Sequence, residues 1–374
     1  MSSASQKQRR TTALAALSWL LALSVVPAHA AAEPTGADVI PVTAAVAGQV
    51  IDGALRHLQA AYVYPEVAAR MAAAVRARQR SGAYDGLRTA QALCQQLTAD
   101  LRAVSRDRHL RILYSDRPLA EDRGAAPERP AERAEHLARS RHMNFGFERV
   151  ERLPGNIGYL DLRFFDAPDL AGATAAAAMS LLGNSDAIII DLRRNIGGEP
   201  DMVALLTSYL FDGEPVHLND IYWRPDDSTR QYWTLPYVPG PRLAGRDVYV
   251  LTSRDTFSGG EEFANNLKVL RRATLVGETT GGGAHPVEMR RITDHFGVVV
   301  PAGRALNPVT KSNWEGVGVK PDVEVPAAQA LLHAQVLALK KAVDRAAEDA
   351  PREKLRQALA AAQRDLDALR GGKG

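Results

Sequence analysis

Apolar residues change their spacing along the chain, and this change separates a helical part from a part of mixed structure. Residues 44–114 repeat apolar side chains with a period near 3.6, which predicts three consecutive amphipathic helices with short connections. Residues 117–140 are charged and contain three prolines, so they indicate a linker that becomes helical toward its end. Beyond residue 143, short runs of branched apolar residues replace the helical period.

This later part predicts strands that alternate with helices. The strand-like runs are "NIGYLDLRFF", "DAIIIDLR", "DVYVLTS" and "ATLVGE", and the helix-like runs are "LAGATAAAAMSLL", "PDMVALLTSYLF" and "EEFANNLKVL". Such alternation indicates βαβ units in a sheet that helices cover on both faces. Residues 287–306 resemble a hairpin that turns at 294–297, and the chain after Pro326 is mostly helix, broken into two pieces at Pro351.

We therefore expect an α/β fold in which a helical domain precedes a βαβ core. The expected segments are a signal peptide (1–30), an N-terminal helical cap domain (44–114), a charged linker with a helix (115–143), the core (144–326) and a C-terminal helical extension (327–374).

The first 30 residues predict a secretory signal peptide. Three basic residues precede an uncharged stretch that ends in Ala28-His29-Ala30, a small-x-small cleavage pattern. The apolar core at 13–26 is shorter than the roughly 20 residues of a membrane span, so we expect cleavage after Ala30 and export to the periplasm or the cell exterior. An uncleaved membrane anchor is the alternative.

Charge and motif content narrow the function classes. Without residues 1–30 the chain carries 43 basic and 43 acidic residues, so its charge balance does not favour a nucleic acid partner. We expect no integral span after cleavage, because the remaining chain has no other apolar run of sufficient length. Cys94 is the single cysteine, and G-x-G-x-x-G, Walker A and H-E-x-x-H motifs are absent, so we expect neither a metal nor a cofactor.

Three loops at strand ends hold candidate chemistry, because open α/β sheets place their sites at the carboxyl ends of strands. Ser258 in "TSRDTFSGGEE" is either a helix N-cap with Glu261 closing a capping box or a nucleophile at a strand-to-helix turn. Gly197 and Gly198 in "DLRRNIGGEPD" either form an ordinary turn or present N–H groups to a ligand. Glu315 in "NPVTKSNWEGVGVKPD" is a solvated charge or a site residue.

A histidine at a helix-to-strand junction completes a possible constellation. His109 follows a predicted helix end and opens "HLRILYS", a short alternating run, where a surface or capping role is the alternative to a base. Serine, histidine and glutamate at the ends of elements, with a Gly-rich loop beside them, are the parts of a serine hydrolase.

Seven segments in order resemble one enzyme family. They are "AAYVYPEVAARM", "LTADLRAVSRDRHLRI", "NFGFERVERLPGNIGYLDLRFF", "IIIDLRRNIGGEPDMV", "TSRDTFSGGEEFANNLK", "ATLVGETTGGGAHP" and "NWEGVGVKPDVEV". Over about residues 45–326 the chain resembles the tail-specific (carboxyl-terminal processing) serine proteases of peptidase family S41. The similarity is to the branch with tricorn core protease and the repeats of interphotoreceptor retinoid-binding protein. It implies a Clp-protease/crotonase-like core with a helical cap. Only about 40 residues separate Tyr114 from Ile157, too few for a PDZ domain.

The resemblance implies roles for individual residues. Ser258 takes the position of the nucleophile, His109 that of the general base, and Glu315 that of the glutamate that helps to orient the histidine. The N–H groups that match the oxyanion hole are those of Gly259 and of Gly197 or Gly198.

Two positions depart from family patterns. Members with a serine–lysine dyad carry the lysine 25 residues after the serine, where this chain has Gly283, so the resemblance leaves His109 as the base. Tricorn has a serine directly before its histidine, and here that residue is Arg108. Ser105 or Asp107 could take over the link between Glu315 and His109.

The resemblance implies a serine peptidase that acts on peptide or protein substrates, and the signal peptide expected at residues 1–30 implies that it is exported. The alternative is a carrier of hydrophobic ligands on the same fold, because the retinoid-binding relatives bind apolar molecules. The segment "IYWRPDDSTRQYWTLPYVPGPRL" concentrates aromatic residues and prolines that either line such a pocket or form an ordinary packed loop.

Overall fold

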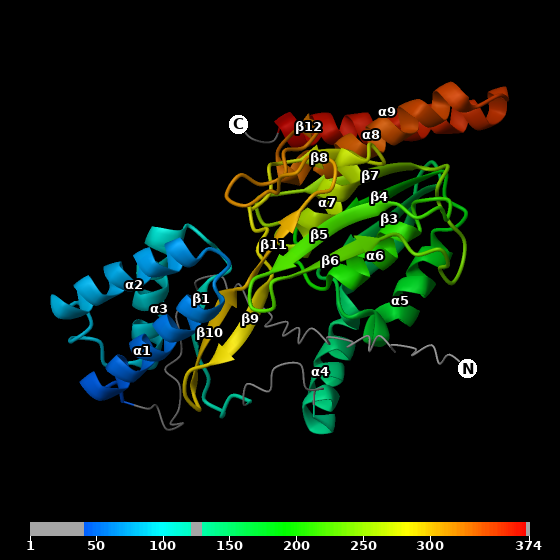
Figure 1. Ribbon diagram of the computed structural model, residues 1–374. Helices are drawn as coiled ribbons and strands as arrows, with labels where there is room; N and C mark the ends of the chain where they lie inside the picture. The colour runs from blue at the N-terminus through cyan, green and yellow to red at the C-terminus, as the bar shows by residue number, and fades with distance from the viewer. Residues whose placement is uncertain (1–40, 121–128, 372–374) are drawn as a thin grey trace, which may run out of the picture.

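The molecule has three parts, which Figure 1 shows from the N-terminal helices through a large central sheet to the C-terminal helices. The computed structural model describes residues 41–120 and 129–371. The signal peptide expected for residues 1–30 lies outside this description.

The central sheet confirms the predicted alternation of strands and helices. Its six strands have the order β12-β8-β7-β4-β3-β2. Every neighbouring pair is parallel except β2 with β3 at one edge, which is antiparallel. The strands are β2 (Phe147–Leu153), β3 (Ile157–Leu162), β4 (Ala187–Asp191), β7 (Asp247–Thr252), β8 (Thr274–Gly277) and β12 (Val323–Glu324).

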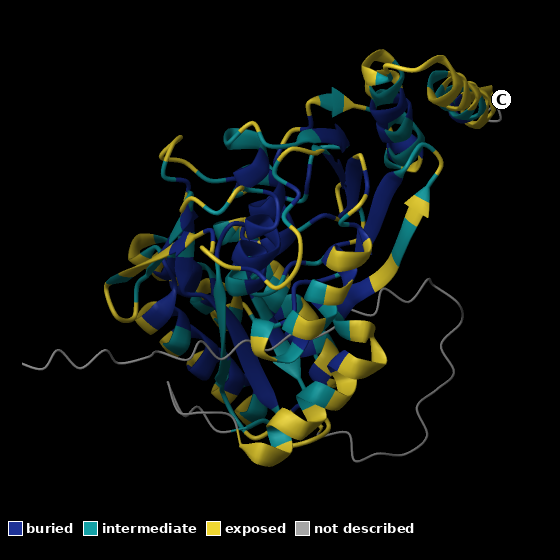
Figure 2. Ribbon diagram, turned by 90° about the vertical axis from the view of Figure 1, so that its right-hand side faces the viewer, coloured by how far each residue is buried: buried dark blue, intermediate teal, exposed yellow. Residues whose placement is uncertain are grey.

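Helices cover both faces of this sheet. One face carries α5 (Pro168–Leu181), α6 (Pro200–Ser208) and α7 (Gly259–Val269), and the other carries α8 (Ala327–Arg345) and α9 (Asp349–Gly371). Ile188 and Ile190 of β4 lie in the first core and Ile189 in the second, since successive strand side chains point to opposite faces. Because β4 is buried at every position, its sequence is a continuous apolar run. Figure 2 shows the buried strands and the exposed outer sides of the helices.

The N-terminal helices share their core with strands from much later in the chain. They are α1 (Ala44–Ala61), α2 (Pro65–Arg80) and α3 (Ala90–Ser105). The strand that follows them, β1 (Arg111–Tyr114), pairs antiparallel with β10 (Phe296–Pro301), which pairs with β9 (Val287–Arg291). Phe296, Val298 and Val300 of β10 lie in one core with the helices. This pairing brings the region around residue 109 to the segment just before β9.

A third sheet contains the aromatic segment that the sequence offered as a possible ligand pocket. It joins β11 (Gly303–Leu306), β5 (His217–Trp223) and β6 (Ser228–Trp233) in that order. Tyr232 is buried, whereas Trp233 and Tyr237 are 41% and 75% exposed. The segment is therefore a β-hairpin and its following loop, with its aromatic side chains divided between core and solvent.

Several boundaries differ from those that the sequence predicted. The β9–β10 hairpin turns at 292–295 rather than 294–297. The C-terminal helices break at 346–348 and not at Pro351, which lies in the first turn of α9, where its missing N–H costs no hydrogen bond. The linker helix is α4 (Pro130–His142), and a short 3₁₀ turn, η1 (Asn144–Gly146), follows it.

Within the described ranges, no helix is both long enough and apolar enough to cross a membrane.

A buried acid lies near the start of α7. The Glu262 side chain is buried, and its Oε1 has no hydrogen-bond partner among the residues that the structure describes. Burial raises the pKa of Glu262 to about 7, because a carboxylate loses its hydration there without full compensation. The group is therefore protonated in the native protein at mildly acidic pH, while in the unfolded chain it ionises near its ordinary pKa.

Glu262→Gln is expected to stabilise the protein at pH 8 and to have little effect at pH 4. An acid whose native pKa is raised removes stability as the pH rises from its unfolded pKa to its native pKa, here up to about 7. The gain at pH 8 should be about 3 kcal/mol, from 1.4 kcal/mol per pKa unit. Urea unfolding at both pH values measures it, with the exposed Glu135→Gln as control. Equal effects of Glu262→Gln at the two pH values would contradict the assignment.

Candidate active site

Ser258 lies at the sharp turn between β7 and α7. Its φ of 53° and ψ of −121° are unusual for a residue with a side chain, and such conformations persist only where the surroundings hold them. The surroundings here are hydrogen bonds on both sides of the residue. The Ser258 N–H donates to Glu261 Oε2 at 2.9 Å, and its carbonyl accepts the N–H groups of Glu261 and Glu262. The capping contact of Glu261 and the strained serine turn are thus present together.

The glycine pair after β4 lies directly against this turn. Gly197 and Gly198 have φ values of 104° and 130°, which favour glycine. A Cβ on Gly197 would lie 2.6 Å from Ser258 Cβ, and a Cβ on Gly259 would lie 3.0 Å from the Gly198 nitrogen. Only residues without side chains allow the two loops to approach so closely.

The three glycine N–H groups at this contact differ in their hydrogen bonding. The N–H of Gly197 donates to Asn195 Oδ1 at 2.9 Å. The N–H groups of Gly198 and Gly259 have no hydrogen bond to any other described residue. Two neighbouring donors beside Ser258 therefore remain available to an acceptor.

His109 reaches the serine turn from the N-terminal helices. Helix α3 ends at Ser105, Arg106 adopts the left-handed conformation with φ 59°, and the chain turns into β1. The His109 ring packs against the ring of Phe257, the residue before Ser258, with centroids 4.5 Å apart. Arg108 ties this contact down, since its guanidinium donates to the Gly281 carbonyl at 2.6 Å and lies over the Phe257 ring.

The His109 ring is largely buried, with 11% of its side chain exposed. Burial lowers the pKa of His109 to about 4, and the nearby Asp107 carboxylate only partly opposes this effect. The ring is therefore neutral at pH 7. Its Nδ1 has no hydrogen-bond partner among the described residues, and Asp107 Oδ1 lies 4.0 Å away.

A side chain such as lysine has no room at position 283 in this arrangement. A Cβ there would lie 2.3 Å from Phe257 Cζ and 2.7 Å from His109 Cε1. The space into which a side chain at residue 283 would extend is thus filled by the two rings. His109 and a side chain at residue 283 exclude one another in this arrangement.

Glu315 lies next to His285 rather than next to His109. Its Oε2 accepts the Ala284 N–H at 2.6 Å and is 3.6 Å from Nδ1 of His285. Neither a hydrogen bond nor an ion pair joins Glu315 to His109 within the described part of the chain. Burial and, to a smaller extent, the negative charge of Asp107 raise the pKa of Glu315 to about 7.

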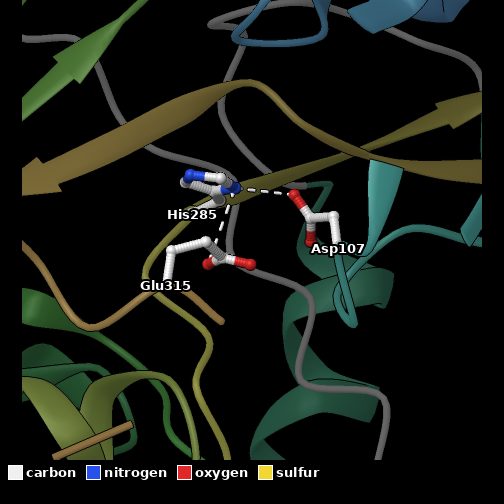
Figure 3. A group of neighbouring side chains, drawn as sticks. All are labelled: Asp107, His285 and Glu315. Atoms are coloured by element: carbon white, nitrogen blue, oxygen red, sulfur yellow. Dashed lines mark hydrogen bonds and ion pairs between the residues drawn. The ribbon is translucent and has the colours of Figure 1, made fainter. Parts of the chain in front are cut away.

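Asp107 connects the two histidines. Its Oδ2 accepts a hydrogen bond from His285 Nδ1 at 2.6 Å, and its Oδ1 accepts the backbone N–H of His109 at 3.0 Å. Burial pushes the pKa of Asp107 upward, but the hydrogen bond and the charge of His285 outweigh burial and lower it. Figure 3 shows Asp107 and Glu315 both pointing toward His285. Ser105, the other possible link, accepts the Asp107 N–H at 3.2 Å and shapes the turn.

Asp107, His285 and Glu315 are also the described group that could hold a metal ion, since their ligand atoms lie within 4.8 Å of one another. Ligands on a tetrahedral zinc ion with bonds near 2.1 Å would be roughly 3.4 Å apart. The 2.6 Å between His285 Nδ1 and Asp107 Oδ2 is instead the distance of a charge-assisted hydrogen bond. In this geometry His285 and Asp107 are joined by a hydrogen bond, and Glu315 lies beside them.

His285 is the residue of this site that sequence reasoning missed. It stands two residues after Gly283 in "GGGAHP", a segment that resembles the family without suggesting a role for its histidine. A titratable residue directly beside a Gly-rich loop was the available signal. Its partner Asp107 is 178 positions away, and the β1–β10 pairing brings their two segments together.

The fold and these contacts describe an α/β protein with a serine at the start of a helix, a buried histidine, and N–H groups beside the serine that donate to no other described residue. The model of peptidase family S41 matches residues 156–325, and the model of the N-terminal domain of this family in eukaryotic IRBP matches residues 35–144. The chain belongs to peptidase family S41.

Individual relatives agree with this assignment. Carboxyl-terminal-processing peptidase 2 of Arabidopsis thaliana is 29% identical over 188 residues, 48% of this chain and 35% of the relative. The tail-specific protease of Haemophilus influenzae is 33% identical over 104 residues, 26% of this chain and 13% of the relative. The chain thus spans about a third or less of the length of these curated relatives.

A solved structure supports the fold. A lipoprotein from Streptococcus agalactiae superposes with a TM-score of 0.53 at 15% identity, covering 81% of this chain and 98% of the other. The expected fold class, an α/β core preceded by a helical domain, is confirmed.

Gly283→Ala is expected to destabilise the protein by about 1–3 kcal/mol, because its methyl group would overpack the Phe257 and His109 rings. Gly172→Ala is the matched control: it lies in α5, and no atom comes within 4 Å of its added Cβ. Urea unfolding of both variants measures the difference. Gly283→Ala as stable as the native chain would show that the rings do not occupy this space.

Proposed function

We propose that the chain is an exported serine peptidase that cleaves peptide bonds through Ser258, with His109 as general base. The observation that carries the proposal is the contact between two loops at the serine. The strained turn of Ser258 and Gly259 lies against Gly197 and Gly198, and the N–H groups of Gly198 and Gly259 have no hydrogen-bond partner among the described residues. The neutral His109 ring lies on the adjacent Phe257. Membership of family S41 agrees with it.

The first half of the reaction forms an acyl-enzyme. His109 accepts the hydroxyl proton of Ser258 while the serine oxygen bonds to the carbonyl carbon of the substrate. The tetrahedral intermediate then collapses as protonated His109 gives this proton to the leaving amine. In the second half, water takes the place of the amine, and the same proton transfers regenerate Ser258.

Gly198 and Gly259 are the proposed oxyanion donors. Gly197 is the less suitable member of the glycine pair, because Asn195 already accepts its N–H. Fixed donors aimed at the developing negative charge contribute about 3 kcal/mol each in well-studied hydrolases. The fixed backbone conformation of both loops means that little reorganisation is needed when the charge forms.

The substrate and the site of action belong to the same proposal. The relatives named for carboxyl-terminal processing and for tail-specific proteolysis indicate peptide or protein substrates. The basic and apolar pattern of residues 1–30 supports export.

A fluorophosphonate that reacts with activated serines is expected to label the purified protein at Ser258. Labelling should disappear in Ser258→Ala and fall by a factor of about 1,000 or more in His109→Ala, since loss of the base costs as much in related triads. Mass spectrometry of the digested adduct identifies the labelled residue, and Ser312→Ala, an exposed serine in the loop before Glu315, is the control. An unlabelled native protein, or a label elsewhere, would refute the proposal.

The labelling rate of Glu315→Gln, which lacks the site carboxyl of pKa about 7, should stay constant from pH 8 to pH 5 and fall as the pH decreases through about 4. The base must be unprotonated to act, and the lowered pKa of His109 keeps it so down to this value. Circular dichroism at each pH verifies that the protein remains folded. A rate that already falls near pH 6.5, the ordinary histidine value, would mean that the base is not in the buried environment of His109.

A further inference from the structure

His285 is a buried titratable residue for which the proposed mechanism has no use. It is 4% exposed and follows the glycine loop that packs against His109. Its Nδ1 contacts two carboxylates, whereas its Nε2 is buried without a hydrogen-bond partner among the described residues. A buried nitrogen without a hydrogen bond destabilises the folded protein, so packing alone does not account for a histidine at this position.

The contacts of His285 form a continuous path from Glu315 to His109. Glu315 Oε2 lies 3.6 Å from His285 Nδ1, and His285 Nδ1 donates to Asp107 Oδ2 at 2.6 Å. The other oxygen of Asp107 accepts the His109 backbone N–H and lies 4.0 Å from His109 Nδ1. No direct contact joins Glu315 to His109 in the described chain, whereas these side-chain contacts through His285 and Asp107 connect them.

The surroundings hold the path in place. The ring of Tyr64 lies edge-on to His285 with centroids 5.6 Å apart, and the hydroxyl of Tyr62 donates to Asp107 Oδ2 at 3.3 Å. Backbone N–H groups fix both ends, from Ala284 onto Glu315 and from His109 onto Asp107. His285 is the member whose hydrogen bond joins the segment before β1 to the segment before β9.

We propose that His285 is a positioning residue that bridges Glu315 to Asp107 and thereby holds the Asp107 carboxylate against His109. This inference rests on the proposed role of His109 as the general base. Asp107 is then the carboxylate that orients His109, and Glu315 acts on the base only through His285. His285 itself does not touch the substrate or the reacting atoms.

Two substitutions separate the hydrogen bond of His285 from its volume. Asparagine places an amide N–H near the position of Nδ1, so His285→Asn can keep the bond to Asp107. Leucine fills a similar space without a donor, so His285→Leu removes the bond. Asp107→Asn removes the carboxylate charge that the bridge is proposed to hold.

The first readout is the rate of fluorophosphonate labelling at Ser258. His285→Leu is expected to lower it about tenfold or more, because a base that loses its orienting partner loses much of its activity. His285→Asn should stay within about threefold of the native rate if the bond is kept. The double variant His285→Leu/Asp107→Asn should be no slower than the slower single variant, since residues that act through one path are not additive. A native rate in His285→Leu, or multiplicative effects in the double variant, would overturn the proposal.

The second readout does not depend on catalysis. In protein labelled with ¹³C-histidine, the ring signal of His109, assigned from its loss in His109→Gln, should shift in His285→Leu and stay in place in His285→Asn. An unchanged His109 signal in His285→Leu would overturn the bridge whether or not Ser258 is labelled. If His285→Leu shifts the His109 signal but the native protein is not labelled at Ser258, the peptidase proposal is refuted and the bridge is kept.

A variant at the other end of the path covers the case in which His285→Leu does not fold. Glu315→Gln keeps an oxygen that can accept the Ala284 N–H but loses the charge beside His285. It should shift the His109 signal in the native background and lower the labelling rate. A Glu315→Gln protein with the native His109 signal and the native rate would contradict the path.

Discussion

One buried carboxylate holds the site together. Glu261 is fully buried, and its two oxygens accept the N–H groups of Ser258, Gly282 and Gly283 and the hydroxyl of Thr280. Burial raises the pKa of Glu261 and these hydrogen bonds partly oppose the rise. The first turn of α7 and the glycine loop after β8 are therefore fixed to the same group. Removal of this carboxylate would leave several buried donors without a partner, which would lower the free energy of unfolding.

The glycine loop that Glu261 fixes contacts the other parts of the site. The glycine loop leaves room at Gly283 for the His109 ring, and two residues later it presents His285 to Asp107. The strand pairing of β1 with β10 brings Asp107 and His109 to this loop. The site thus consists of short segments around residues 107, 197, 258, 283 and 315. Hydrogen bonds from backbone N–H groups to buried side-chain oxygens hold them, as at Asp107, Asn195 and Glu261.

Sequence patterns predicted the parts of this protein that depend on local rules. Apolar spacing predicts the buried strand 187–191 and the helices at 44–61 and 90–105. The segment "TFSGGEE" predicts both a helix start and a candidate nucleophilic serine. Glu261 could be predicted as a capping residue, yet its bonds to Thr280 and to the glycine loop depend on tertiary structure. For the same reason, pairing Glu315 with His109 was the natural expectation, whereas the structure places His285 and Asp107 between them. No local pattern encodes a contact across 178 positions.

The central claim is that the N–H groups of Gly198 and Gly259 form the oxyanion site of Ser258. A crystal structure of the protein with a peptidyl phosphonate on Ser258 tests it most directly, because the phosphonyl oxygen mimics the oxyanion. We expect this oxygen to lie about 2.7–3.1 Å from both nitrogens while the Gly197 N–H stays bonded to Asn195. A phosphonyl oxygen that points to solvent, or one bound to Gly197 after its bond to Asn195 has broken, would contradict it.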